Sequence, residues 1–175
     1  LVARNFPVAG RATEHSFLRL IARGMSQKGH KVTVLAGNDP LGQAELDQDG
    51  VKVYFVTEGR SARRSSFFQD AAKNKFSELH RAEPFHLLHS VDAAAYRIAR
   101  YKKHYRMAVA YDVEATRMSQ LFAILGMGQE SLGGLLATAL AVTYSFLRSY
   151  YGGDRQLLKT ADGVFVTSPQ QRLFL

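Results

Sequence analysis

The stretch GRATEHSFLRLIARGMSQKGHKVTVLAG, residues 10–37, contains a loop, a helix and a strand in immediate succession. Phe17, Ile21 and Met25 recur every four residues, which predicts an amphipathic helix. Gly29 can adopt the left-handed conformation that ends a helix, and the apolar, β-branched run that follows it is typical of a strand in a parallel sheet. Because the opening residues LVARNFPVAG read as a strand already under way, the chain predicts strand, loop, helix and strand in its first 36 residues.

Beyond this stretch, strand patterns and helix patterns continue to alternate. Short apolar runs predict strands at residues 51–56, 85–90, 107–111 and 163–167. Helices are predicted after a capping-box spacing at Ser66 and Gln69, after Asp92 as N-cap, over most of residues 116–160, and from Ser168-Pro169 onward. Such alternation implies right-handed crossovers. The sequence therefore predicts an α/β fold, a doubly wound, mainly parallel Rossmann-like sheet of about six strands with helices on both faces, in a single domain.

Length and composition limit the function classes. With 175 residues, 46% of them hydrophobic, the chain can bury the core of one compact domain. It contains no cysteine, which excludes a disulfide framework, a thiolate metal site and a catalytic thiol. The opening residues lack the pattern of a secretory signal, and the longest apolar run, at residues 132–142, is shorter than the roughly 20 residues that span a bilayer. We expect a cytoplasmic protein without a metal site.

The charge of the chain favours an anionic partner. Its formal net charge is +8, which suits nucleic acid, phospholipid headgroups or a phosphorylated small molecule. Five of the ten residues 97–106, RIARYKKHYR, are Lys or Arg, interleaved with tyrosines. This segment reads either as a solvated helix face, the commoner explanation, or as a surface for an anionic membrane or nucleic acid.

Ligands of doubly wound sheets bind beyond the carboxyl ends of the strands, which directs attention to three loops. These are residues 4–13, 90–92 and 112–116. The first loop leads into a helix whose amino terminus offers free N–H groups to an anion, and Gly10 and Ala12 permit close approach of a phosphate. A single glycine is also what an ordinary turn requires, so both interpretations stay open.

The predicted fifth strand delivers Tyr111, Asp112 and Glu114 to the carboxyl edge of the sheet. Alternation places Asp112 and Glu114 on one side if the strand continues that far. A carboxylate there can hold a sugar hydroxyl or act in acid–base chemistry, or Asp112 or Thr116 can simply cap the next helix.

The histidines give weaker signals. His86 and His89 are three residues apart in a predicted strand and point to opposite faces, so they do not make a two-histidine metal site. Core or hydrogen-bonding roles suit them better. His15 at the start of the first helix is a candidate for ligand contact, although a surface histidine is the simpler explanation.

With these elements in place, residues 10–37 resemble the amino-terminal domain of GT-B glycosyltransferases, particularly family 4. Members commonly show a Gly-His-x-Val-x-Val junction between helix and strand, and Gly29, His30, Val32 and Val34 match it. FHLLHSVD (85–92) is similar to the family's fourth strand with its histidine. The segment leading toward the second domain is matched by Asp154, Ala161, Asp162, Val164, Val166 and Ser168.

The resemblance implies transfer of a sugar from a nucleotide sugar, UDP- or GDP-linked, to a glycan, lipid or small-molecule acceptor, with retention of configuration and without a bound metal or tightly bound cofactor. It implies that residues 1–175 are the acceptor-side domain, that a carboxy-terminal domain binds most of the donor, and that this chain alone is inactive. An anionic membrane is a further partner in this reading, with a peripheral position on its inner face, and nucleic acid is disfavoured.

The resemblance also assigns roles to single residues. The donor phosphates would approach Gly10, Arg11, Ala12 and Thr13, and Tyr111 and Asp112 would orient the acceptor hydroxyl, standing where many members place a His-Asp pair. Four further residues are expected on the acceptor side: His15, His89, Asp92 and Glu114.

Other readings are open at this point. The chain can be a stand-alone Rossmann-like or flavodoxin-like module that binds a nucleotide or a protein without catalysis. A sugar-nucleotide epimerase shares the architecture, and a charge-driven nucleic-acid binder would show steep salt dependence.

Overall fold

The computed structural model describes residues 1–6, 17–37, 42–56, 65–113, 137–141, 143–144 and 153–166. Their main elements are, in chain order, α1 (Phe17–Gln27), β1 (Val32–Ala36), β2 (Glu45–Gln48), β3 (Val51–Phe55), α2 (Ser65–Ala82), β4 (Leu87–Val91), the 3-10 helix η2 (Asp92–Ala95), α3 (Tyr96–Ala99), α4 (Lys102–Tyr105), β5 (Ala108–Val113), α7 (Gly153–Thr160) and β6 (Gly163–Val166). The helix start predicted at Ser168 and most of the helical region 116–160 lie outside the described residues.

The strands form two groups that the opening segment connects. Their orders are β1-β3-β2 and β4-β5-β6, and every pairing is parallel except that of β2 with β3. Val2 makes parallel bridges to Leu35 of β1 and to Ser90 of β4. Its N–H donates to His89 O (2.8 Å), and its carbonyl accepts from Val91 N–H (3.0 Å). The predicted mainly parallel, doubly wound α/β fold is confirmed.

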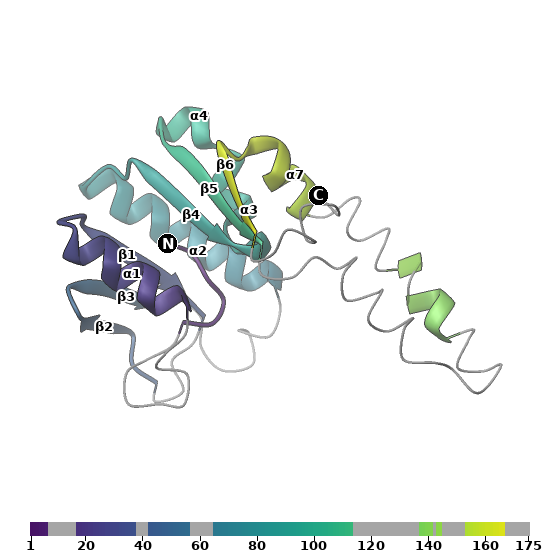
Figure 1. The fold of residues 1–175 in the computed structure, drawn as a ribbon, viewed down its shortest axis with the longest axis horizontal. Helices are drawn as coiled ribbons and strands as arrows, with labels where there is room; N and C mark the ends of the chain where they lie inside the picture. Colours follow the sequence, from purple (N-terminus) through teal and green to yellow (C-terminus); the bar gives the residue numbers. More distant parts are fainter. Residues whose placement is uncertain are drawn as a thin grey trace.

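Helices cover both faces of this sheet (Figure 1). On one face, which we call the α1 face, Ala22 packs in a cluster with Val34 and Val53, and Leu18 packs with Val91. On the other face, the core face, α2, α3 and α7 pack over the strands. The main hydrophobic core lies there, and its largest fully buried side chains are Phe68, Leu88, Ile98, Leu157, Val2, Val109 and Val113.

Local sequence explains where several elements begin and end. Gly29 has φ +85° after the end of α1, as the left-handed helix stop requires. A Cβ at Gly153 would lie 2.8 Å from Tyr96 Cγ, so glycine permits α7 to start directly against α3. Tyr96 also donates from its hydroxyl to Gln156 Oε1 (2.8 Å), which ties the two helices together.

Two details differ from the sequence-based expectation. Helix α2 already includes Ser65 and Ser66, and the Gln69 side chain donates to Ala93 O (2.8 Å), so the expected capping box at Ser66 is wrong. Strand β2 was not predicted, because Glu45–Gln48 is a short, mostly polar segment without a β-branched residue. It pairs antiparallel with β3 at the edge of the sheet.

The strand order locates the functional edge. The segment at Val2 lies between β1 and β4. After this segment the chain continues into β1 on one side, and after β4 the chain continues into β5 on the other side. The strand order therefore reverses between the opening segment and β4. In open α/β sheets, ligands bind at the carboxyl ends of the strands beside such a reversal.

Candidate functional site

Four of the site residues expected from the sequence can be placed. Tyr111 and Asp112 lie in β5, His89 lies in β4, and Asp92 follows β4. The expected phosphate loop and two acceptor-side candidates are outside the described residues: Gly10, Arg11, Ala12, Thr13, His15 and Glu114.

The two residues expected to act together on β5 face opposite sides of the sheet. Tyr111 belongs to the main core, where its hydroxyl donates to Asp154 Oδ1 of α7 (3.3 Å). Burial, followed by the negative charges of Asp154 and Asp92, raises the pKa of Tyr111 far above its ordinary value. Asp112, the next residue, points to the α1 face because side chains alternate along a strand. The structure does not bring Tyr111 and Asp112 together.

Asp112 instead lies beside His89. The distance from His89 Nε2 to Asp112 Oδ2 is 3.4 Å, and the two residues are 9% and 2% exposed. Neither atom forms a hydrogen bond of normal geometry with the described part of the chain, although both are buried. Buried polar atoms are nearly always hydrogen-bonded, so this pair is an exception that needs an explanation.

Small side chains give the imidazole its place on the sheet. His89 is in register with Ala110 of β5, and Ala110 is in register with Gly163 of β6. Because neither residue fills the space above the strands, the imidazole ring can reach toward Asp112 and toward Phe165, the register partner of Asp112. The His89 and Phe165 rings stack with centroids 6.0 Å apart and planes inclined by 19°.

The protonation of His89 follows from its surroundings. Burial lowers the pKa of His89, and the Asp112 carboxylate acts in the opposite direction with a smaller effect. The net lowering keeps the imidazole neutral at pH 7. A neutral imidazole that carries its proton on Nε2 is a donor toward Asp112 Oδ2.

The loop after β4 has a different cap from the one expected. Asp92 has φ +46°, and the helical turn that it opens has no side-chain cap from its N-cap residue, Val91. Ser90 Oγ accepts from Ala95 N–H (3.0 Å) and donates to Asp92 O (2.8 Å). The expected capping role therefore falls to Ser90, whose hydroxyl is buried on the core face. Asp92 lies at the carboxyl edge, where its charge reaches Tyr111.

Asp162 and Asp154, two residues that carry the family resemblance, form hydrogen bonds within the fold. Asp162 Oδ2 accepts from Val109 N–H (2.8 Å) and Oδ1 accepts from Lys102 Nζ (2.8 Å), which fastens the start of β6 to β5 and α4. The Lys102 hydrogen bond is the largest cause that lowers the pKa of Asp162. Asp154 holds Tyr111, as described above.

The basic segment 97–106 is partly used within the fold. Arg97 forms an ion pair with Asp70, Lys102 binds Asp162, and Arg100 lies over the Tyr96 ring at 5.7 Å. These contacts support the reading of a structured helix surface for these three cations. Lys103 and Arg106 are exposed beside them.

A groove of about 630 Å³ lies at the opposite edge of the sheet. Its lining includes residues just before β1 and β4, such as His30, Lys31 and Phe85, together with residues of β1, β3, α2 and β4, among them His89. Lys31 is already paired with Glu83, and Lys52 lies 5.4 Å from the Tyr54 ring centroid. Because this groove is at the amino ends of the strands, it is not where a doubly wound fold binds its ligand.

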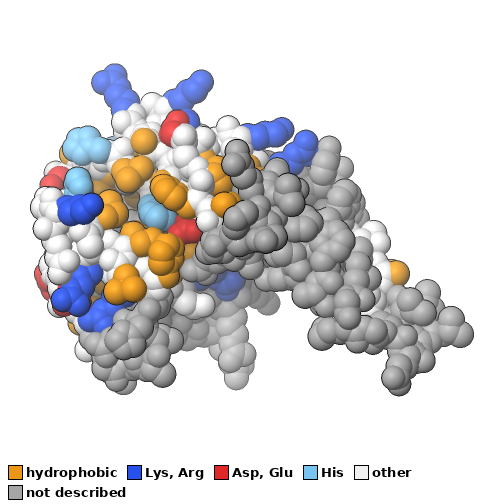
Figure 2. Space-filling view, in the orientation of Figure 1, with side chains coloured by type: hydrophobic (Ala, Val, Ile, Leu, Met, Phe, Trp, Pro, Cys, Tyr) orange, Lys and Arg blue, Asp and Glu red, His pale blue; other side chains and the backbone are white. Residues whose placement is uncertain are grey.

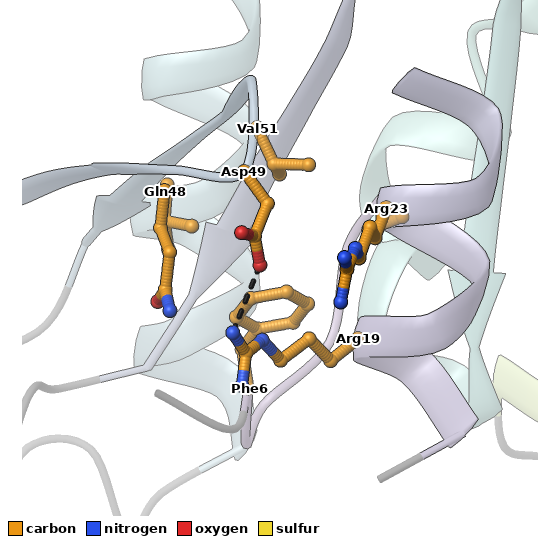
Figure 3. Close-up of a pocket in the computed structure, with 8 residues that line it drawn as sticks. Phe6, Arg19, Arg23, Gln48, Asp49 and Val51 are labelled. Atoms are coloured by element: carbon orange, nitrogen blue, oxygen red, sulfur yellow. Dashed lines mark hydrogen bonds and ion pairs between the residues drawn. The ribbon is translucent and has the colours of Figure 1, made fainter. Parts of the chain in front are cut away.

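A smaller cavity separates α1 from the turn between β2 and β3. Figure 3 shows Arg19 and Arg23 projecting from α1 toward this turn, with Phe6 beneath them. Arg19 forms an ion pair with Asp49 (2.8 Å). The cavity has a volume of about 10 Å³, enough for at most one water molecule, so it is too small for a substrate. The Arg19–Asp49 ion pair connects the turn of the edge hairpin to α1.

The α1 face around Asp112 is apolar. Figure 2 shows hydrophobic side chains gathered over this face of the sheet, with histidine and acidic side chains among them. Phe165 is 57% exposed there and Leu87 is 43% exposed. A buried carboxylate within an apolar, partly exposed surface is suited to hold one hydroxyl group of a ligand.

The described residues offer neither a metal site nor a membrane-spanning helix. Among them, no cluster of three or more His, Asp or Glu side chains is arranged to hold a metal ion. No helix within the described ranges has the length and apolar character needed to cross a membrane.

Comparisons with known proteins identify the family. No curated protein matches the chain. A solved structure of sucrose-phosphate synthase from Thermosynechococcus elongatus is similar with a TM-score of 0.57 and 14% sequence identity, over 92% of this chain and 76% of that one. At that identity the likeness shows a shared fold. A family model described as "Glycosyl transferase 4-like domain" matches residues 15–175, so the chain belongs to the glycosyl transferase 4-like family.

Proposed function

We propose that this chain is the acceptor-side, amino-terminal domain of a two-domain cytoplasmic glycosyltransferase. In this proposal a carboxy-terminal domain of the same protein binds most of a UDP- or GDP-sugar, and the carboxyl edge of the present sheet forms the other wall of the cleft. The observation that supports it most is Asp112, a carboxylate 2% exposed at the carboxyl end of β5, with an oxygen that lacks a hydrogen bond of normal geometry among the described residues. The family match over residues 15–175 supplies the reaction class.

Asp112 acts on the acceptor in this scheme. Its carboxylate accepts a hydrogen bond from the acceptor hydroxyl and aims that oxygen at the anomeric carbon of the donor sugar. The oxygen forms a bond to that carbon while the bond from the carbon to the nucleotide's phosphate oxygen breaks. The hydroxyl proton leaves on the departing phosphate, and the configuration is retained. No metal takes part.

The other expected residues enter with the donor and the acceptor. The loop of Gly10, Arg11, Ala12 and Thr13 approaches the donor phosphates through the amino terminus of α1. The acceptor is a glycan, a lipid or a small molecule. A lipid acceptor would bring the basic segment 97–106 against an anionic membrane.

Turnover by the joined two-domain protein tests this function. The protein is incubated with a panel of UDP- and GDP-sugars and candidate acceptors, with and without EDTA, and nucleotide release is measured. We expect release with one donor class, unaffected by EDTA, and none from the 175-residue chain alone. Tight nucleotide-sugar binding by the isolated chain, without turnover by the joined protein, would instead identify a stand-alone binding module.

A further inference from the structure

His89 of β4 lies next to Asp112 of β5, the residue on which the proposed function depends. We propose that His89 is a positioning residue for Asp112: its Nε2–H holds Oδ2 of the carboxylate and leaves Oδ1 for the acceptor hydroxyl. This inference rests on the proposed role of Asp112. It concerns a histidine on a neighbouring strand that does not itself touch the reacting atoms.

The burial of both side chains is the first argument. Leaving a buried carboxylate oxygen without a hydrogen-bond donor is costly, so a carboxylate that is 2% exposed needs a donor. Among the described residues, the donor beside Oδ2 is His89 Nε2, at 3.4 Å. A shift of a few tenths of an ångström brings the two atoms within hydrogen-bond distance. A ligand that orders the site can supply that shift.

The fixed position of the imidazole is the second argument. The Phe165 ring stacks on it from β6, and Ala110 below it leaves room for the ring to lie across β5. Three adjacent strands therefore contribute one residue each to a layer made of His89, Asp112 and Phe165. A side chain held by stacking keeps its donor aimed at one atom, which an orienting group requires.

The alternative is that the His89–Asp112 pair has only a structural role. A carboxylate with a structural role in this chain, Asp162, forms hydrogen bonds of normal length. Asp162 accepts hydrogen bonds of 2.8 Å from both Lys102 and Val109 N–H. Asp112 and His89 have no such bonds with the described residues and are separated by 3.4 Å. Long contacts in a site without ligand are common among groups that tighten on substrate binding.

The first test needs no glycosyltransferase assay. Nitrogen-15 NMR of the histidine-labelled 175-residue chain at pH 7 reports which ring nitrogen of His89 carries the proton. We expect a neutral ring protonated on Nε2, and Asp112→Asn should change that signal because the acceptor changes. Asp47→Asn, on the exposed edge strand β2, is the matched control and should leave it unchanged. A ring protonated on Nδ1, or a His89 signal insensitive to Asp112→Asn, would overturn the pairing.

The second test uses the joined two-domain enzyme and a rescue. His89→Gln keeps an N–H donor near the position of Nε2, whereas His89→Leu removes it at similar size. We expect His89→Leu to lower kcat about tenfold or more with little change in donor KM, and His89→Gln to retain most of the activity. Equal loss in both variants, or no loss in either, contradicts the positioning role. If the unmodified enzyme transfers no sugar, the proposed function fails, while the NMR result still decides the pairing.

Discussion

Tyr111 and Asp112 are neighbours on β5, equally buried, and differ in what surrounds them. Tyr111 lies in the main core and donates its hydroxyl to Asp154 of α7. Asp112 lies on the α1 face, where its Oδ2 faces His89 at 3.4 Å and has no hydrogen bond of normal geometry with the described residues. Tyr111 therefore has its polar partner within the fold, whereas Asp112 keeps an oxygen without a partner among the described residues, and the proposed function uses that difference.

The largest effect on stability is expected from the core face. Ile98→Ala should lower the free energy of unfolding by about 3 kcal/mol, because Ile98 is fully buried in the main core, where α3 packs against α2 and α7, and its truncation leaves a cavity. Phe165→Ala, on the α1 face, should cost about 1 kcal/mol or less, because that ring is 57% exposed. Urea denaturation followed by circular dichroism measures both. Equal losses would contradict the division between the two faces.

Replacing both His89 and Asp112 by apolar residues should maintain or raise the free energy of unfolding. The double variant His89→Leu, Asp112→Leu removes two buried polar groups that are poorly satisfied, so we expect unchanged stability or a gain of about 1–2 kcal/mol. Sugar transfer by the joined enzyme should be lost. The thermal midpoint is the readout, and a fall of several degrees would mean that the pair stabilises the fold.

Replacing Tyr111 should have a smaller effect. Tyr111→Phe removes a hydroxyl whose hydrogen bond to Asp154 is long, 3.3 Å, so a loss of about 1 kcal/mol is expected. The same denaturation series provides the value. Asp154→Asn is the matched variant, since it keeps an acceptor for the hydroxyl and should cost less.

The smallest expected effect is the pH dependence of stability, to which one histidine on each face of the sheet contributes. Burial lowers the pKa of His89, and burial together with His104 lowers the pKa of His80, whose Nδ1 accepts from Phe85 N–H (3.1 Å). The unfolded chain therefore binds protons more readily than the native state just below pH about 6.5. Stability should be fully present above that pH and should fall as the pH is lowered through it. His89→Gln and His80→Gln should each flatten part of this decline, and unaltered curves in both would refute the assignment.

Much of the fold could be predicted because its signals are local. The spacing of Phe17, Ile21 and Met25, the stop at Gly29 and the β-branched strands indicated the order of elements that the structure shows. The order in turn predicted a parallel doubly wound sheet. Strand β2 was missed because an edge strand needs no apolar pattern.

The site was harder to predict because it depends on register. Alternation along β5 separates Tyr111 from Asp112, a consequence that the family resemblance obscured. The approach of His89 to Asp112 depends on the pairing of His89 with Ala110, and no local pattern fixes which residues of two separate strands face each other. The same holds for Lys102 and Asp162, which meet across 60 positions of sequence.

The most direct test compares the two neighbours on β5 in the joined two-domain enzyme. Turnover of the preferred nucleotide sugar is measured for Asp112→Asn and Tyr111→Phe, after circular dichroism shows that both variants fold. We predict that Asp112→Asn lowers kcat about a hundredfold or more, and that Tyr111→Phe stays within about threefold of the unmodified enzyme. Unchanged turnover in Asp112→Asn, or an equal loss in both variants, would contradict the account.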